Sequence, residues 1–206
     1  SGINGGTPGK RNAAAGVNAD TVSPKLLRAY ATDSVTLLLV FNEPLDSIQA
    51  SSAARYQISD GAGSPLSASA LPGRFNRVML TLAGSAALQR NRVYSVTVNA
   101  LADCSGNTIG QDNSARVALF EQAGKKDMVI NEILFNPLPN GNDYVEIYNR
   151  GNQVLNLRNT YVACRNTSGA LSEIRQLSVE DYLFFPGDFI VITEKASLVI
   201  NNYVAM

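Results

Sequence analysis

The sequence predicts an all-β fold made of two tandem β-sandwich domains. The chain has 206 residues, enough for two domains of roughly 100 residues each. Short stretches rich in β-branched and aromatic residues, several of them alternating between apolar and polar positions, are separated by turn residues. No apolar spacing of three to four residues persists through three helical turns, so long helices are not expected.

The expected first domain covers residues 21–124. It follows a stretch rich in Gly, Asn and Ala, residues 1–20, which we interpret as a linker. One short helix is an option around Asp46–Ala54. The longest apolar stretch of the domain has the length and composition of a core strand. Seven strands are expected in all: Lys25–Tyr30, Ser34–Phe41, Arg55–Ser59, Leu66–Leu71, Arg77–Leu82, Arg92–Val98 and Ala115–Leu119.

A polar segment, Glu121–Asp127, marks the expected boundary between the domains. It contains Gly124, and connections of this kind commonly join domains with small interfaces, so we expect two semi-independent units. The second domain, residues 125–206, is expected to end in a short helix at Lys195–Tyr203. Its strands are expected at Met128–Phe135, Tyr144–Asn149, Val154–Leu157, Tyr161–Cys164, Tyr182–Phe185 and Phe189–Thr193.

Composition excludes several classes of function. The chain contains no histidine, which removes histidine-based nucleophile systems and histidine-ligated zinc or haem. Lys+Arg and Asp+Glu number 17 each, so no nucleic-acid partner is expected. No apolar stretch approaches membrane-spanning length, so no membrane insertion is expected. Because residue 1 is Ser and no signal segment follows it, we expect the chain to be an excerpt of a longer protein.

Several segments of the first half resemble the bacterial Ig-like modules of surface-layer and other secreted multidomain proteins. These are the strand end and turn Phe41–Asp46 (FNEPLD), Tyr56 in a following strand, Asn91–Val98 and the loop Asp103–Asn107. The resemblance covers about residues 21–120. It implies an Ig-like β-sandwich for this half.

The second half resembles a lamin-tail domain, an Ig-like sandwich that also occurs in secreted bacterial proteins. The closing strands of that family are not found after Tyr203, so the domain is expected to be incomplete. Asn4–Gly9 resembles the exit of a preceding lamin-tail domain. The second-half resemblance is carried by Val129–Ile133, Asp143–Asn149, Leu155–Leu157, Phe185–Asp188 and Phe189–Ile192.

The loop around Asp103 offers oxygen ligands from Asp103, Asn107 and Asp112. Calcium takes six to eight oxygens and this loop supplies about three, so we expect no metal or other cofactor, with calcium as the alternative. Glu43 and Asp46 frame a proline turn, which we interpret as structural rather than as a catalytic pair.

A second acidic group, Glu132, Asp143 and Glu146, lies around the first two strands of the second domain. It would suit a cation or a glycosidic oxygen, but a glycoside hydrolase needs two carboxylates facing one cleft. We therefore favour hydrogen-bonded carboxylates at the strand ends, and we expect no catalytic residue in the chain.

Two covalent features remain open from the sequence. Cys104 and Cys164 would form a disulfide in an oxidising compartment, but two separate thiols are the favoured interpretation. Thr21, Ser34 and Ser47 each follow an Asp and precede an aliphatic residue. These tripeptides resemble a bacterial O-glycosylation acceptor, while ordinary turn and cap pairs are the alternative interpretation.

The resemblances imply a non-enzymatic interaction or spacer module, for adhesion or presentation, in a secreted or cell-surface bacterial protein. The expected partners are neighbouring domains of the same polypeptide, with a surface protein or a glycan as an external partner. The alternative is a carbohydrate-binding or carbohydrate-active β-sandwich that uses the carboxylates at its strand ends.

Overall fold

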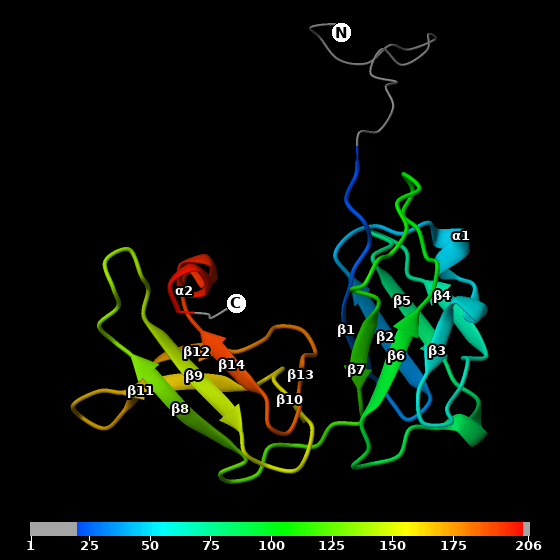
Figure 1. Cartoon of the computed structure of the whole chain (residues 1–206). Helices are drawn as coiled ribbons and strands as arrows, with labels where there is room; N and C mark the ends of the chain where they lie inside the picture. The colour runs from blue at the N-terminus through cyan, green and yellow to red at the C-terminus, as the bar shows by residue number, and fades with distance from the viewer. Residues whose placement is uncertain (1–19, 204–206) are drawn as a thin grey trace, which may run out of the picture.

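The chain folds into two β-domains that lie side by side and are joined by one connection (Figure 1). A computed structural model describes residues 20–203. Residues 1–19, most of the expected linker, and residues 204–206 lie outside the described residues. Within the described part, strands dominate and helices are short, which confirms the all-β prediction.

The first domain is a sandwich of two antiparallel sheets. Every expected strand is present, and its ends lie within two residues of the predicted ones. Short helices occupy α1 (Ser47–Ala50), η1 (Ala53–Arg55) and η2 (Gly84–Ala86). One sheet has the order β1 (Leu26–Ala31), β2 (Thr36–Phe41), β5 (Arg77–Thr81), β4 (Ser67–Ala70), and the other has the order β3 (Tyr56–Ile58), β6 (Tyr94–Val98), β7 (Ser114–Val117).

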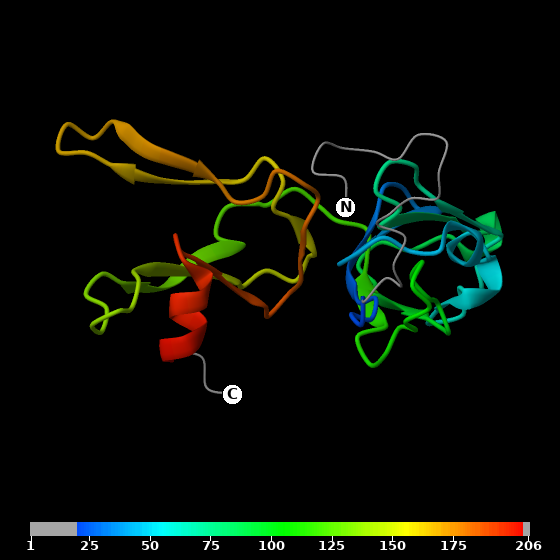
Figure 2. The same ribbon diagram turned by 90° about the horizontal axis from the view of Figure 1, so that it is seen from above.

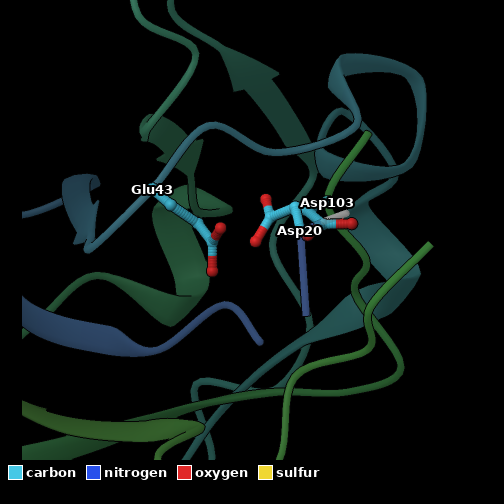
Figure 3. Close-up of side chains that lie close together, drawn as sticks. All are labelled: Asp20, Glu43 and Asp103. Atoms are coloured by element: carbon cyan, nitrogen blue, oxygen red, sulfur yellow. The ribbon is translucent and has the colours of Figure 1, made fainter. Parts of the chain in front are cut away.

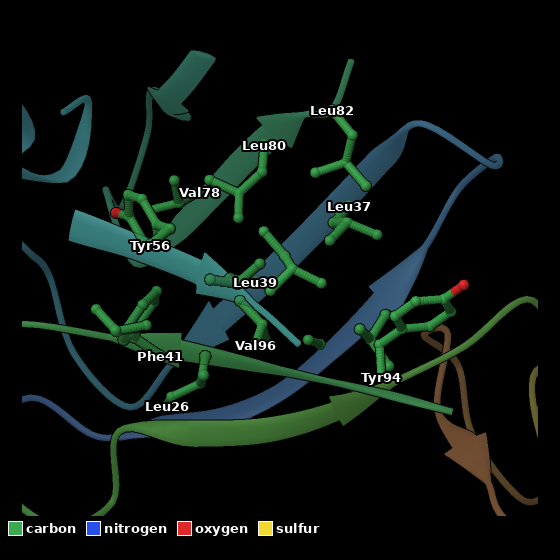
Figure 4. Packing of buried hydrophobic residues seen from close by; sticks show 14 of the residues in the cluster. Leu26, Leu37, Leu39, Phe41, Tyr56, Val78, Leu80, Leu82, Tyr94 and Val96 are labelled. Carbon is green, nitrogen blue, oxygen red and sulfur yellow. The ribbon is translucent and has the colours of Figure 1, made fainter. Parts of the chain in front are cut away.

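Strand alternation builds the core between these two sheets. Leu37 and Leu39 of β2 are fully buried against Val78 of β5, and Tyr56 and Val96 face them from the other sheet (Figure 4). Each side chain buried in this way stabilises the fold by about 1.5–3 kcal/mol relative to an exposed one. The first domain therefore has a core of its own.

The outer face of β2 is also covered, although a strand of a simple two-layer sandwich exposes one face. Leu38 and Val40, together with Tyr30 of β1, pack in an apolar cluster with residues of the second half. A strand buried on both faces has a continuous apolar sequence rather than an alternating one, which explains the uninterrupted run in β2. The two domains are therefore in contact through this apolar cluster. The partners from beyond β7 in this cluster are Ala118, Val154, Leu183 and Phe185.

The second domain contains three small antiparallel sheets. The hairpin formed by β11 and β12 extends away from the rest of the domain (Figure 2). Strand β12 was not expected, since its side chains are mostly exposed and include Glu173 and Arg175. The sheets are β14 (Phe189–Ile192), β9 (Tyr144–Asn149), β8 (Met128–Leu134) in that order, β10 (Leu155–Asn156) with β13 (Leu183–Phe184), and β11 (Tyr161–Arg165) with β12 (Leu171–Gln176).

The helix α2 (Ala196–Tyr203) follows the last strand, where a helix was expected. In the described part of the chain, no helix is long and apolar enough to cross a membrane. The predicted boundary at Gly124 falls between β7 and β8.

A buried asparagine organises the centre of the second domain. Asn149 at the end of β9 is fully buried, and its side-chain amide donates to the carbonyl oxygens of Gln153 (3.0 Å) and Phe184 (2.9 Å). Its backbone N–H donates to the carbonyl of Asp188 at 3.0 Å. The turn before β14 needs Gly187, whose φ is +82°, a value that favours glycine. Asn149 is thus a structural residue of the core.

Candidate functional site

Three carboxylates meet at one end of the first domain. The side chains of Asp20, Glu43 and Asp103 come from the segment before β1, the turn after β2 and the loop between β6 and β7 (Figure 3). Their carboxylate oxygens lie within 4.8 Å of one another. We call these three residues the carboxylate triad.

Asp103 is the best-anchored member of the triad. It is 4% exposed, and one carboxylate oxygen accepts from the backbone N–H groups of Ser105 and Asn107, both at 2.8 Å. The other oxygen accepts from the Asn107 side-chain amide at 2.8 Å. Burial alone would raise the pKa of Asp103, but these hydrogen bonds outweigh it and lower the pKa below its usual value. The charged form of Asp103 therefore holds its own loop in shape.

Glu43 responds to the same surroundings in the opposite direction. Loss of water around its carboxyl raises its pKa, and the negative charges of Asp20 and Asp103 raise it further. The side-chain amide of Asn42 donates to Glu43 at 3.3 Å and partly opposes the shift. The triad thus brings three acidic side chains together where solvent access is reduced.

A hard cation is the ligand that this donor set would suit, since calcium prefers carboxylate oxygens. The expected set differs from the observed one. Asp112 forms an ion pair with Lys25 at 2.8 Å, and the Asn107 amide acts as a donor to Asp103 rather than offering its oxygen. Asp20 and Glu43 reach Asp103 only through the fold, so no spacing in the sequence could have indicated them. Calcium binding stays the alternative to the expectation of no metal.

The acidic group of the second domain is only partly brought together. Glu132 and Glu146 are register partners on β8 and β9. The Tyr144 hydroxyl donates to Glu132 at 2.7 Å, and the Asn131 amide donates to Glu146 at 2.6 Å. The backbone carbonyl of Asp143 accepts from the Thr193 hydroxyl at 2.7 Å. Both glutamates therefore have hydrogen-bond donors within the sheet, but they lie inside their strands rather than at the strand ends expected from the sequence.

The same hydrogen bond raises the pKa of Tyr144 to about 12. The bond to Glu132 is the largest cause, followed by burial and by the charges of Glu132 and Glu146. Both glutamates stand on strands rather than in a hollow between domains, and the groove described below has no carboxylate from this pair.

The three candidate acceptor hydroxyls share one local geometry. In each tripeptide the Asp carboxylate accepts from the backbone N–H two residues later, at 3.0 Å in Val22, 2.8 Å in Val35 and 2.9 Å in Ile48. The hydroxyl residue is exposed in Thr21 and Ser34 and half-buried in Ser47. All three tripeptides therefore form turns, as the alternative interpretation has it. Thr21 and Ser34 are nevertheless exposed to solvent.

Both cysteines are free thiols in the structure, and both are exposed. Cys104 lies in the loop of Asp103, where its Sγ–H donates to the carbonyl of Leu45 at 3.6 Å. Cys164 lies on β11 in the projecting hairpin. The structure thus has no bond between them.

A groove of about 210 Å³ runs between the two domains. Arg28 of β1 and Arg116 of β7 line one side, and Tyr182, Asp188 and Phe189 line the other. Each arginine is engaged by an acidic residue of the second domain, Arg28 by Glu180 and Arg116 by Asp188. The groove is therefore part of the contact between the domains.

The two antiparallel sheets of the first domain form a sandwich of the Ig-like kind. The family model described as bacterial Ig-like domain matches residues 12–120, more than half of the chain. The chain belongs to this family. The second half is not covered by that match.

Among curated proteins, no relative matches the chain. Three solved structures of the S-layer protein SbsC are similar to it. The structure of rSbsC(31-844) is 17% identical, with 74% of this chain and 19% of that chain covered and a TM-score of 0.42. The N-terminal part of SbsC is 20% identical, with coverages of 74% and 33% and a TM-score of 0.42. Domains 1–6 of SbsC are 17% identical, with coverages of 86% and 24% and a TM-score of 0.43. The chain thus spans 19–33% of the length of these structures.

Proposed function

We propose that this chain is a non-enzymatic structural and interaction module of an exported bacterial surface protein. One observation carries the proposal beyond family membership. The carboxylates that could take part in catalysis instead stabilise the fold. Asp103 accepts hydrogen bonds that close its own loop, and Glu132 and Glu146 accept hydrogen bonds inside their sheet. A group that shapes a turn or a strand pair is poorly placed to change its protonation state during a reaction.

The alternative function, a carbohydrate-active sandwich, predicts that the chain binds or hydrolyses glycans. The whole chain would be tested on a glycan array and on a panel of glycoside hydrolase substrates, with the Glu132→Gln and Glu146→Gln variants beside it. We expect no turnover in any of the proteins. Turnover by the unchanged chain that disappears in either variant would refute the non-enzymatic assignment.

Surface location has its own test in the native host. Intact cells would be treated with a protease or with an antibody raised against this chain. We expect the module to be cleaved or labelled without lysis, because a presentation module must face the outside. A signal that appears only after lysis would contradict the proposal.

We further propose that the second half is a lamin-tail domain. The segments that carry the resemblance lie in β8, β9 and β14, which form one sheet, and in β10 and the turn before β14. An experimental structure of the second half, compared with known lamin-tail domains, would test this. The order β14-β9-β8 should superpose on the matching strands, and a different strand order there would exclude the family.

Thr21, Ser34 and Ser47 are proposed as O-glycosylation sites of the exported protein. The exposed positions of Thr21 and Ser34 support this, and the half-buried Ser47 should be modified least. Intact mass of protein from the native host would be compared with protein from a standard expression host. An added mass that falls stepwise in Thr21→Ala and Ser34→Ala is expected, and the bare polypeptide mass in native protein would refute the proposal.

A further inference from the structure

The first domain presents an apolar surface that the second domain covers. Leu38 and Val40 of β2 and Tyr30 of β1 meet Leu183 and Phe185 from the other domain. Tyr30 and Val40 are each 6% exposed, and Leu183 and Phe185 are 7% and 6% exposed. Reorienting the domains would return these side chains to water, which opposes any hinge motion at this place.

Glu180 of the second domain reaches across the same surface. Its two carboxylate oxygens accept separately from Arg28 of β1 and Arg77 of β5. Arg28 and Arg77 are both register partners of Val40, so Glu180 binds the two arginines that flank Val40 across the sheet. The Arg28 guanidinium also lies 5.9 Å from the centre of the Tyr182 ring. One carboxylate held by two arginines on different strands resists rotation more than a single ion pair would.

A second polar contact lies on the other sheet. The Arg116 guanidinium of β7 lies 4.1 Å from the centre of the Phe185 ring and donates to Asp188 at 2.6 Å. Phe185 thus contacts the apolar cluster and a cation at the same time. A ring–cation contact of this kind is attractive, and more so where water is excluded.

The connection between the domains is itself tied down. The backbone N–H of Glu121 donates to the carbonyl of Val154 at 2.8 Å, and Glu121 forms a parallel bridge with Leu155 of β10. The Glu121 side chain also pairs with Arg90 of the first domain. The start of the connection is therefore fixed to the second domain by one bridge and to the first domain by one ion pair.

We infer that the two domains form one rigid body in solution, with Glu180 and Phe185 holding their relative orientation. Glu180 pairs with two strands of one sheet, and Asp188 pairs with Arg116 of the other sheet. The apolar cluster adjoins both contacts through Val40 and Phe185, so the second domain is attached to both sheets of the first. The two domains therefore keep a fixed angle relative to each other.

Nuclear magnetic relaxation of backbone ¹⁵N nuclei and residual dipolar couplings test this in the whole chain. One rotational diffusion tensor and one alignment tensor should fit both domains of the unchanged protein. Two separate tensors in that protein would overturn the inference.

The variants Glu180→Gln and Phe185→Ala should each loosen the joint, so that the two domains need different alignment tensors. Glu194→Gln is the matched control, because Glu194 is an exposed residue between β14 and α2. Unchanged chemical shifts at Leu37 in the first core and at Leu157 in the second core would show that the variants remain folded. A single tensor in both variants, as in the control, would overturn the role given to these two residues.

Discussion

The buried hydroxyl of Tyr56 provides a sharp test of how the first domain is held together. Tyr56 is fully buried, and its hydroxyl donates to the carbonyl of Ala50, the last residue of α1, at 2.7 Å. Carbonyl groups at a helix end lack a partner within the helix, so this hydrogen bond fills that role. Burial raises the pKa of Tyr56 far above its usual value, which keeps the hydroxyl a donor.

In Tyr56→Phe the ring stays and its packing is retained, so only the hydrogen bond is lost. Leaving a buried carbonyl without a donor costs about 1–3 kcal/mol, and we expect a loss near 2 kcal/mol in the free energy of unfolding. Urea unfolding followed by circular dichroism and tyrosine fluorescence measures it, since the chain has no tryptophan. The loss in the free energy of unfolding should be confined to the first domain.

Tyr161→Phe is the matched control, because Tyr161 on β11 is 56% exposed. Its effect should stay below about 0.5 kcal/mol. Equal losses in the two variants, or no loss in Tyr56→Phe, would refute the role given to this hydrogen bond.

Three further predictions concern the charged and reactive groups. Folding raises the pKa of Glu43 above 4.5, so the stability contributed by protonated Glu43 is complete at low pH and is lost as the pH rises through the raised pKa. In thermal melts, Glu43→Gln should therefore be more stable than the unchanged chain at neutral pH. This difference in stability should vanish below about pH 4. The pKa of Tyr144, about 12, should fall towards 10 in Glu132→Gln when followed by NMR of the ring carbons, and an unchanged pKa would exclude the hydrogen bond as its cause. Cys104 and Cys164 should both be alkylated without reductant or denaturant, giving two mass adducts, whereas no adduct before reduction would indicate a disulfide.

Local pattern was enough to predict most strands. Alternation and turn residues are properties of neighbouring positions, and a strand needs only these to be recognised. The strand β12 was missed because its exposed side chains follow no such alternation. The structural role of Asp46 could also be predicted from the sequence, because it depends on neighbouring residues. Its carboxylate caps α1 by accepting from the N–H groups of Ile48 (2.9 Å) and Gln49 (3.1 Å).

The carboxylate triad could be predicted from the sequence only in part. Asp103 was identified because its loop residues are adjacent in the sequence and can bond to one another. Its neighbours Asp20 and Glu43 arrive from two other segments, so their approach depends on how the strands pair. Electrostatic effects such as the raised pKa of Glu43 follow from that approach and not from the residue itself.

The sequence alone thus determined the β class, the positions of most strands along the chain and the Ig-like character of the first half. The interface between the domains was decided by tertiary structure. Its signal was present in β2, where Leu38 and Val40 interrupt the expected polar positions, but nothing local says what covers that face. Only the register of β1, β2 and β5 aligns Arg28, Val40 and Arg77 in one row, and only the folded second domain brings Glu180 to it, because these contacts join segments that no short-range pattern connects.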